Sequence, residues 1–568
     1  MPRMVTPRLA AAFAAAIALA GPAAAQGPPP KLDLTLTPRP AEHVLAVRMV
    51  LQHPDFKAGD GLVHLPLTLV GIPSARYDGA ALTARDEAGP IPLAQSEEAP
   101  TPQGTYRRWS VGRATQGDVT ISFDAPPRAV SAATNNGPLF DLREEAGAFL
   151  GAGVGFLATP VRSGPWRVHL AWDLSQSPAG SRGVWSYGDG AVDIVLPSEA
   201  LEFSYYAGGA LKRYPSEPAG RFGYYWATDP PFDPADLAQR IQALYAYMSG
   251  FFGDTSSSYR VFARSNPYLG AGGTSLAHSF MFGYHGPSKP TADSLQLLIA
   301  HEMAHTWPAM QGEHGDTAWY SEGTAEYYSL ALSWRAHAIS LDKVIATLNE
   351  RADAYYTNPF RALSNPEAAK KFWTDPIAQT VPYGRGWLYL VQTDAQIRKA
   401  SGGKRSLEDV VKDLYRRQTA KQPYGIPQWL ELVGRELGPA KARAGYDRMA
   451  SGGLMVPPKD AFAPCLTVVR HDARPIELGF ARASLNDDRV VRDLVPGSTA
   501  DKAGVRNGDA ITAMSDFDKV RRDETLPFTL TLRRNGSETT VSYLPRGPAE
   551  EGWRWARNRK APASACRF

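Results

Sequence analysis

Two histidines and a glutamate form the most reactive cluster in the chain, in the order His301-Glu302-Met-Ala-His305. Residues four apart on a helix lie on one face, so His301 and His305 can offer imidazole nitrogens to a single ion. Glu302 then lies beside that ion, where its carboxylate can take a proton from a water molecule whose pKa the ion lowers. The spacing therefore predicts a zinc site (Zn²⁺) with a general base.

A third protein ligand is needed, because a catalytic zinc typically has three protein ligands and one open position. We predict that Glu322 is this ligand, on a second helix that begins near Ser321. Glu326 follows four residues later, so it could hydrogen-bond a ligand imidazole from outside the coordination sphere. Glu313 and His314 are alternative ligands, but the glycines around them favour a solvent-exposed loop.

The residues before the first histidine predict the helix that carries the motif. Thr291 begins the segment as a capping residue, and Leu295, Leu298 and Ile299 then recur at helical spacing. We therefore expect both histidines to lie on a helix.

The region from residue 26 to residue 200 is predicted to be a β-sandwich without chemistry of its own. Apolar and polar residues alternate there between clusters of Gly, Pro and Asp, which is typical of strands. The runs are residues 32–37, 43–51, 118–123 and 166–172.

Helical periodicity replaces this alternation from Pro234 and continues to about residue 450, as in residues 236–248. A strand-like run at residues 259–264 interrupts it and leads into Gly272-Gly273-Thr-Ser-Leu-Ala-His278. An extended edge at that place could pair with a peptide substrate by strand addition.

Composition describes a globular chain of 568 residues with 43% apolar content and a formal charge of +4. A balance so close to neutral argues against a nucleic-acid partner. Residues 1–25 are predicted to be a signal peptide: Arg3 and Arg8 precede an apolar run at residues 9–20, and three alanines offer a cleavage site. We therefore expect a periplasmic or secreted protein with no membrane-spanning segment after cleavage.

The two cysteines, Cys465 and Cys566, bracket the last hundred residues. A secretory context permits a disulfide between them. The alternative is a pair of free thiols, but neither has basic or His-rich neighbours that would make it catalytic.

The C-terminal region, residues 461–568, resembles a PDZ domain. Pro-Gly-Ser, Ala-Gly and Gly-Asp follow one another between residues 490 and 511, and Leu478-Gly479-Phe480 resembles the carboxylate-binding loop of that fold. The resemblance implies that peptide C-termini could bind there. The alternative is a module that only supports its neighbour.

The order of signal peptide, β domain, His-Glu-x-x-His domain and PDZ domain is similar to the glycyl aminopeptidase family, peptidase family sixty-one, among the gluzincins. Trp307 and the stretch around Glu322 match its pattern, with sixteen residues, 306–321, between the second histidine and the glutamate. The resemblance implies a multidomain α+β protein with a thermolysin-like, mainly helical catalytic domain at residues 201–460. It also implies that Tyr383 stabilises the oxyanion, with Arg385 in place of a lysine.

One motif departs from that family. The substrate-edge motif usually reads Gly-Gly-Leu-Glu-His, and here Gly272, Gly273 and His278 remain as substrate-binding candidates without the glutamate that would pair with a free α-amine. Glu326 is one candidate to replace it. The sequence thus predicts a zinc peptidase acting on peptides, with aminopeptidase activity on small N-terminal residues. An endopeptidase and a non-catalytic peptide-binding protein are the alternatives.

Overall fold

The computed structural model describes residues 28–562 and Cys566, apart from a few short gaps. The gaps are residues 102–103, 133, 135–136, 218–219, 255–257, 269 and 486–487. The predicted signal peptide lies outside the described residues. The described residues up to Ala309 form one compact unit, and those from Met310 form a second. The chain is a multidomain α+β protein with a β-rich N-terminal region and a helical part after it.

Two sheets of the first unit share one apolar core. The seven-stranded sheet has the order β16-β13-β1-β2-β9-β5-β6, and a five-stranded sheet has the order β12-β3-β8-β7 with β4 beside β3. Leu34 from β1, Leu65 from β3 and Trp109 from β8 belong to the same buried cluster, so the sheets pack face to face as a sandwich. The strands are β1 (Lys31–Arg39), β2 (Val44–Leu51), β3 (Gly61–Leu69), β4 (Ile72–Pro73), β5 (Leu82–Asp86), β6 (Gly89–Ile91), β7 (Leu93–Glu97), β8 (Gly104–Val111), β9 (Val119–Ala125), β12 (Thr159–Pro160), β13 (Pro165–Trp172) and β16 (Val192–Pro197).

Alternation along the strands explains why the sequence forms this sandwich. In β1 every second residue is buried, and its apolar residues all point to the core. The strand pairs with β2 in antiparallel fashion and with β13 in parallel fashion. All four runs predicted from alternation are strands in the structure.

A third sheet, also of five strands, follows in the order β10-β11-β17-β14-β15. Its central strand β17 is buried along its whole length. The elements are β10 (Arg143–Glu145), β11 (Ala148–Ala152), β14 (Arg182–Trp185), β15 (Gly188–Asp189) and β17 (Tyr205–Gly209), with the short helices α1 (Gly153–Phe156) and α2 (Glu199–Glu202).

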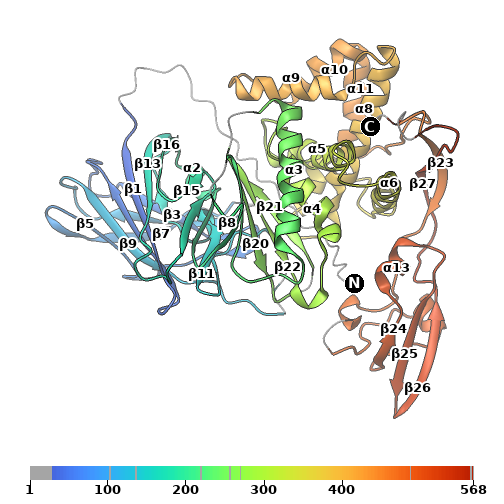
Figure 1. Cartoon of the computed structure of the whole chain (residues 1–568), viewed down its shortest axis with the longest axis horizontal. Helices are drawn as coiled ribbons and strands as arrows, with labels where there is room; N and C mark the ends of the chain where they lie inside the picture. The colour runs from blue at the N-terminus through green and yellow to red at the C-terminus, as the bar shows by residue number, and fades with distance from the viewer. Residues whose placement is uncertain are drawn as a thin grey trace. The chain divides into compact units, whose positions relative to one another are not determined.

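A fourth sheet carries the helix of the His-Glu-x-x-His motif, and its order is β18-β19-β20-β22-β21 (Figure 1). Strands β19, β20 and β22 are parallel, and β21 pairs with β22 as an antiparallel edge strand. Helix α4 packs on β21 and β22. The elements are β18 (Lys212–Tyr214), β19 (Phe222–Trp226), α3 (Pro234–Phe252), β20 (Tyr259–Ser265), β21 (Gly272–Leu276), β22 (Ser279–Tyr284) and α4 (Ala292–Ala304).

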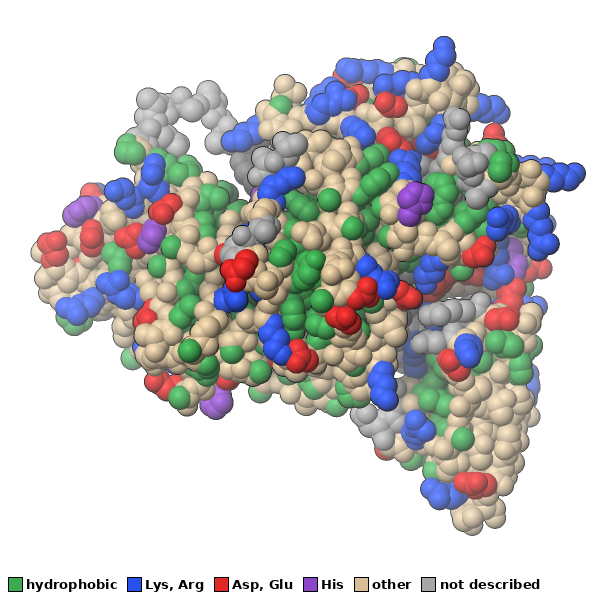
Figure 2. Space-filling view, viewed as in Figure 1, with side chains coloured by type: hydrophobic (Ala, Val, Ile, Leu, Met, Phe, Trp, Pro, Cys, Tyr) green, Lys and Arg blue, Asp and Glu red, His purple; other side chains and the backbone are tan. Residues whose placement is uncertain are grey.

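The second unit begins with a group of helices built around α5 and α8, which pack closely along each other. The helices are α5 (His314–Arg335), α6 (Leu341–Tyr356), α7 (Asn365–Lys371), α8 (Val381–Ala400), α9 (Leu407–Thr419), α10 (Ile426–Leu437) and α11 (Pro439–Ala450). Lys and Arg side chains are numerous over α9 to α11 (Figure 2). Several of them pair with acids, such as Arg405 with Asp409 and Arg417 with Glu431, so this surface is not a single-sign patch.

A two-stranded ribbon, β23 (Leu466–Ala473) with β27 (Glu550–Arg557), leads from the helices to a small C-terminal module (Figure 1). The module has its own apolar core, with Phe480, Phe528 and Leu530 fully buried. Cys465 and Cys566 form a disulfide next to the ribbon. The module's elements are α12 (Thr499–Lys502), β24 (Ala510–Met514), α13 (Phe517–Arg522), β25 (Phe528–Arg534) and β26 (Ser537–Tyr543).

Strand β27 also packs on α6. The side chain of Asn349 accepts a hydrogen bond from the backbone N–H of Trp555 at 2.8 Å and donates one to its carbonyl oxygen at 3.1 Å. Arg554 forms an ion pair with Asp353 one helical turn further on, at 2.5 Å. The ribbon is therefore joined to the helices by polar contacts on one face of α6.

Among the residues that the structure describes, no helix combines the length and apolarity needed to cross a membrane.

Candidate metal centre

Helix α4 presents both histidines of the motif. Thr291 caps its N-terminus, as the sequence predicted, and also forms a capping box with Ser294. His301 lies in the last turn, and His305 follows the final helical residue with a helix-like backbone conformation. Their Nε2 atoms are 3.1 Å apart. Local capping and helical periodicity thus bring two imidazole nitrogens to one point.

The carboxylate of Glu322 lies near these two nitrogens. The candidate ligand atoms of His301, His305 and Glu322 lie within 4.8 Å of one another, and this is the only such group among the described residues. Two imidazoles and one carboxylate are a donor set that suits Zn²⁺. The side chain of Glu322 has no exposed surface and that of His301 very little.

Glu302, the predicted general base, is fully buried. It packs against strand β21, where a Cβ on Gly273 would lie 2.4 Å from its Cγ and 2.6 Å from its Oε1. Since real Cβ atoms do not approach so closely, only glycine leaves the space that the glutamate fills. Sequence reasoning placed Gly273 among the substrate-binding residues and missed this packing role.

The hairpin β21–β22 holds the other substrate-edge residues. Gly272 lies in β21, and His278 lies in the two-residue turn with a left-handed backbone (φ 51°). The ring of His278 packs against Tyr187 at 5.6 Å, and burial lowers its pKa below the usual value. The roles of Gly272 and His278 in substrate binding stay predictions.

Helix α5 begins at His314, seven residues before the expected start near Ser321. The prediction of a solvent-exposed loop is therefore wrong for His314, whereas Gly312 and Glu313 are exposed and lie before the helix. His314 packs against Phe372 and Trp373, with ring centroids 4.5 and 5.4 Å away, and burial lowers its pKa to about 4. Gly315, one of the glycines that suggested a loop, instead allows close packing, since a Cβ there would lie 3.0 Å from Ala369 on α7.

Glu326, one turn after Glu322, is buried and forms an ion pair with Arg351 on α6. Arg351 also donates to the carbonyl oxygen of Glu326 and, at 3.2 Å, to the hydroxyl of Ser329. No local pattern could have identified this arginine. The predicted hydrogen bond from a ligand imidazole N–H to the Glu326 carboxylate stays a prediction.

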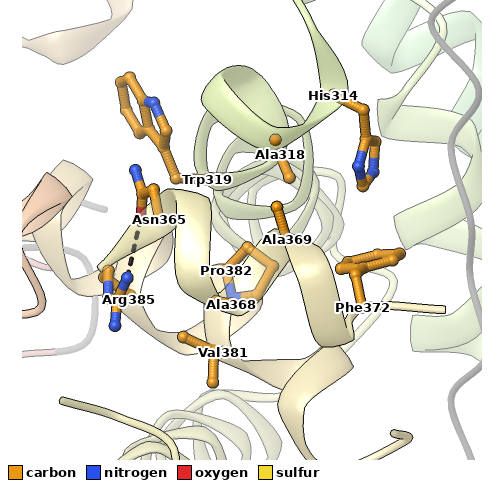
Figure 3. Close-up of a pocket in the computed structure, with 11 residues that line it drawn as sticks. His314, Ala318, Trp319, Asn365, Ala368, Ala369, Phe372, Val381, Pro382 and Arg385 are labelled. Atoms are coloured by element: carbon orange, nitrogen blue, oxygen red, sulfur yellow. Dashed lines mark hydrogen bonds between the residues drawn. The ribbon is translucent and has the colours of Figure 1, made fainter. Parts of the chain in front are cut away.

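Tyr383 lies in the first turn of α8 and is 9% exposed. Two residues later, Arg385 is fully buried. It donates to Asn365 Oδ1 at 2.8 Å (Figure 3). It also donates to the carbonyl oxygens of Arg361, at 2.9 Å, and Leu363. The forked guanidinium therefore ties the connection between α6 and α7 to the start of α8, beside Tyr383.

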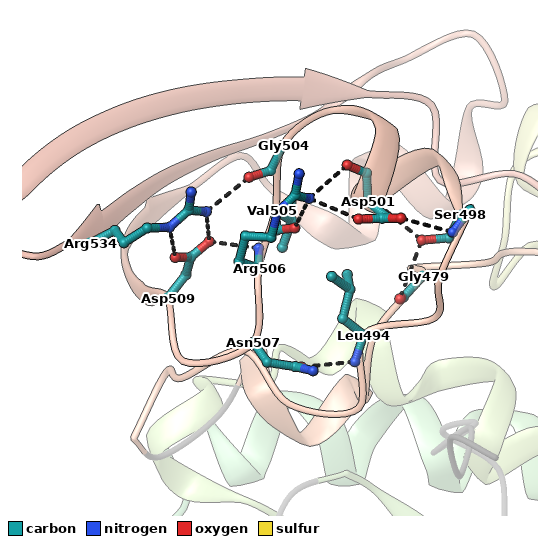
Figure 4. A network of polar contacts seen from close by, with 11 residues as sticks. Gly479, Leu494, Ser498, Asp501, Gly504, Val505, Arg506, Asn507, Asp509 and Arg534 are labelled. Atoms are coloured by element: carbon teal, nitrogen blue, oxygen red, sulfur yellow. Dashed lines mark hydrogen bonds and ion pairs between the residues drawn. The ribbon is translucent and has the colours of Figure 1, made fainter.

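The loop Leu478-Gly479-Phe480 lies in the C-terminal module, with Leu478 and Phe480 in its apolar core, and Gly479 is labelled in Figure 4. Gly479 has φ of 79°, and its carbonyl oxygen accepts from the N–H of Val495 at 2.7 Å. The described residues that follow form a 3₁₀ helix, Arg482–Leu485, and Arg482 stacks over the ring of Phe517 on α13 at 5.2 Å. The described part of this loop thus offers no strand for a peptide to extend, and carboxylate binding there stays a prediction.

Comparisons with known proteins support the fold. No family model matches the sequence, and no curated protein matches it. The aminopeptidase N family protein from Idiomarina loihiensis is similar in structure, with a TM-score of 0.63, over 93% of this chain and 98% of that chain, at 14% identity. This chain therefore has the fold of that protein.

Two other solved structures are more distantly similar, both with a TM-score of 0.45. The M1 zinc metallopeptidase from Deinococcus radiodurans is 18% identical and matches 76% of this chain and 94% of that chain. Native yeast LTA4 hydrolase is 15% identical and matches 75% of this chain and 68% of that chain.

Proposed function

We propose that the protein is a zinc-dependent peptidase that hydrolyses peptide bonds. The observation that carries this proposal is the convergence of His301, His305 and Glu322 within 4.8 Å. The residue next to the first histidine, Glu302, is a buried carboxylate. Structural similarity to an aminopeptidase N family protein adds support.

His301, His305 and Glu322 would hold the ion. When bound, zinc would polarise the substrate carbonyl and make an attacking water more acidic. Glu302 takes the proton of that water and later gives it to the leaving amine. Tyr383 donates a hydrogen bond to the developing oxyanion, and one such donor is typically worth about 3 kcal/mol.

We propose that the enzyme is an aminopeptidase for small N-terminal residues. Support comes from the sequence resemblance to glycyl aminopeptidases and from the aminopeptidase N family protein of similar structure. Glu326 is a weaker candidate for binding the α-amine than the sequence suggested, because Arg351 already pairs with its carboxylate. The disulfide suits the oxidising periplasmic or extracellular setting that we propose.

One experiment tests the reaction and its specificity. The purified protein, with its zinc content measured, is compared with Glu302→Gln on peptide libraries that have free or acetylated N-termini. We expect the variant to keep its zinc and to lose roughly 10²- to 10⁴-fold in kcat. Equal turnover by both proteins would refute the mechanism. Efficient cleavage of acetylated peptides would instead identify an endopeptidase.

A further inference from the structure

Helices α5 and α8 touch backbone to backbone at two glycines. A Cβ on Gly386 would lie 1.8 Å from the carbonyl oxygen of Trp319, and a Cβ on Gly323 would lie 2.6 Å from the carbonyl carbon of Gly386. Both obstacles are backbone atoms, which cannot rotate away as a flexible side chain can. No residue larger than glycine fits this crossing unless the helices move apart.

The crossing lies beside two residues of the proposed mechanism. Glu322 directly precedes Gly323 on α5, and Tyr383 precedes Gly386 by three residues, about one turn of α8. The distance between the two helix axes at this point therefore decides how far the tyrosine lies from the carboxylate.

Hydrogen bonds of Arg385 also hold the start of α8 in place. Arg385 holds Asn365 and the carbonyl oxygens of Arg361 and Leu363, and Figure 3 shows Arg385 and Asn365 beside Trp319 of α5. The first turn of α8 is thus fixed by both the glycine crossing and this buried arginine, which leaves Tyr383 little freedom to shift.

We propose that Gly386 and Gly323 are positioning residues for the reaction: their close crossing sets the place of the Tyr383 hydroxyl relative to Glu322. The inference rests on the proposed function, since it assumes that Tyr383 stabilises the oxyanion.

Gly386→Ala tests it. To bring a carbon to an ordinary contact of about 3.3 Å with the Trp319 oxygen, the helices must separate by about 1.5 Å. A displacement of this size at a catalytic group costs about 10²-fold in rate. We expect kcat to fall about 100-fold per zinc-loaded molecule while KM changes little, because the oxyanion forms only in the transition state.

Binding supplies a second readout. A phosphinic dipeptide that mimics the tetrahedral intermediate should bind Gly386→Ala at least tenfold more weakly, whereas the product amino acid should bind as it does to the wild type. Gly445→Ala is the matched control: it also adds a methyl group to a helix, α11, but its nearest neighbour is 3.7 Å away on Tyr389. Gly445→Ala should have the kcat of the wild type and the same affinity for the phosphinic dipeptide.

The decisive comparison repeats the substitution in Tyr383→Phe. If Gly386 acts through Tyr383, the double variant should have a kcat within threefold of Tyr383→Phe alone. A further 100-fold loss would overturn the inference, because the glycine would then act on something else. Wild-type kinetics for Gly386→Ala beside an impaired Tyr383→Phe would also overturn it, while leaving the proposed function intact.

Failure of the proposed function itself has a different signature. Wild-type turnover by Tyr383→Phe would remove the oxyanion role and the inference with it, and full activity of Glu302→Gln would refute the mechanism as a whole. If Gly386→Ala does not fold, as judged by circular dichroism, Gly323→Ala approaches the same crossing from α5 and enters the same comparison with Tyr383→Phe.

Discussion

Glu322, rather than Glu313, is the third zinc ligand that we propose. Glu322 belongs to the candidate metal group, whereas Glu313 directly precedes the first residue of α5 and is not part of that group. Glu322→Ala removes one of three donors, so we expect it to bind less than one zinc per molecule after dialysis against a weak chelator. Atomic absorption measures this.

Glu313→Ala is the matched control for that substitution and should keep its zinc. Loss of zinc from Glu313→Ala, with retention in Glu322→Ala, would reverse the ligand assignment.

His314 gives a pH dependence of stability. Burial lowers its pKa in the folded chain to about 4, whereas an unfolded chain has the ordinary value of about 6.5. The unfolded state therefore binds more protons between these values, so this histidine's contribution is complete above pH 6.5 and is lost as the pH falls towards 4. The slope is at most about 1.4 kcal/mol for each pH unit.

Urea unfolding at pH 7.0, 5.5 and 4.5 checks this, with His314→Gln as the comparison. The wild type should lose more stability than the variant on acidification. Parallel losses in the two proteins would show that His314 does not titrate in this window.

At the scale of elements, strand β21 and helix α4 meet where Gly273 faces Glu302. Gly273→Ala would place a Cβ 2.4 Å from the Glu302 side chain and so push the proposed base out of place. We expect kcat to fall about 100-fold, with zinc retained, because about 1 Å of misplacement costs that much. Steady-state kinetics with metal analysis measures both.

Gly250→Ala on helix α3 is the control for that change, because its added methyl group would meet no atom within 4 Å. An unimpaired Gly273→Ala enzyme would mean that Glu302 is not held by the strand.

Local signals predicted the elements whose determinants are local. Thr291 and the leucine spacing identified α4, and alternation identified the strands of the sandwich. The start of α5 was missed because Gly312 and Gly315 suggested a loop, although one of them serves helix packing. Local structure depends on residues that are close in the sequence, whereas packing depends on residues that are distant in it.

Contacts between distant residues could not be predicted. The pairing of Arg351 with Glu326 joins two helices, and neither residue type nor spacing indicates its partner. Gly386 is different, since a glycine inside a helical pattern is a signal of packing or function. The sequence contained that signal, but Trp319 could be recognised as the neighbour only in the structure.

At the scale of the whole molecule, the disulfide joins residues 101 positions apart. Chain-entropy models give a loop of this length at most about 4.7 kcal/mol of stabilisation. Replacing both cysteines by serine should therefore lower the unfolding midpoint in urea while zinc-dependent turnover at 25 °C persists. An unchanged midpoint would show that the ribbon and the packing on α6 hold this region without the covalent link.

The contact between α6 and β27 can form only late in the synthesis of the chain. Asn349 and its partner Trp555 are 206 residues apart. Ribosomes add about 5–20 residues per second, so some 10 to 40 s separate the synthesis of the two. Until β27 has been made this contact of α6 cannot form, and contacts of such long range form slowly. Newly made chains should therefore pass through a stage that chaperones can bind and proteases can cut, until β27 docks.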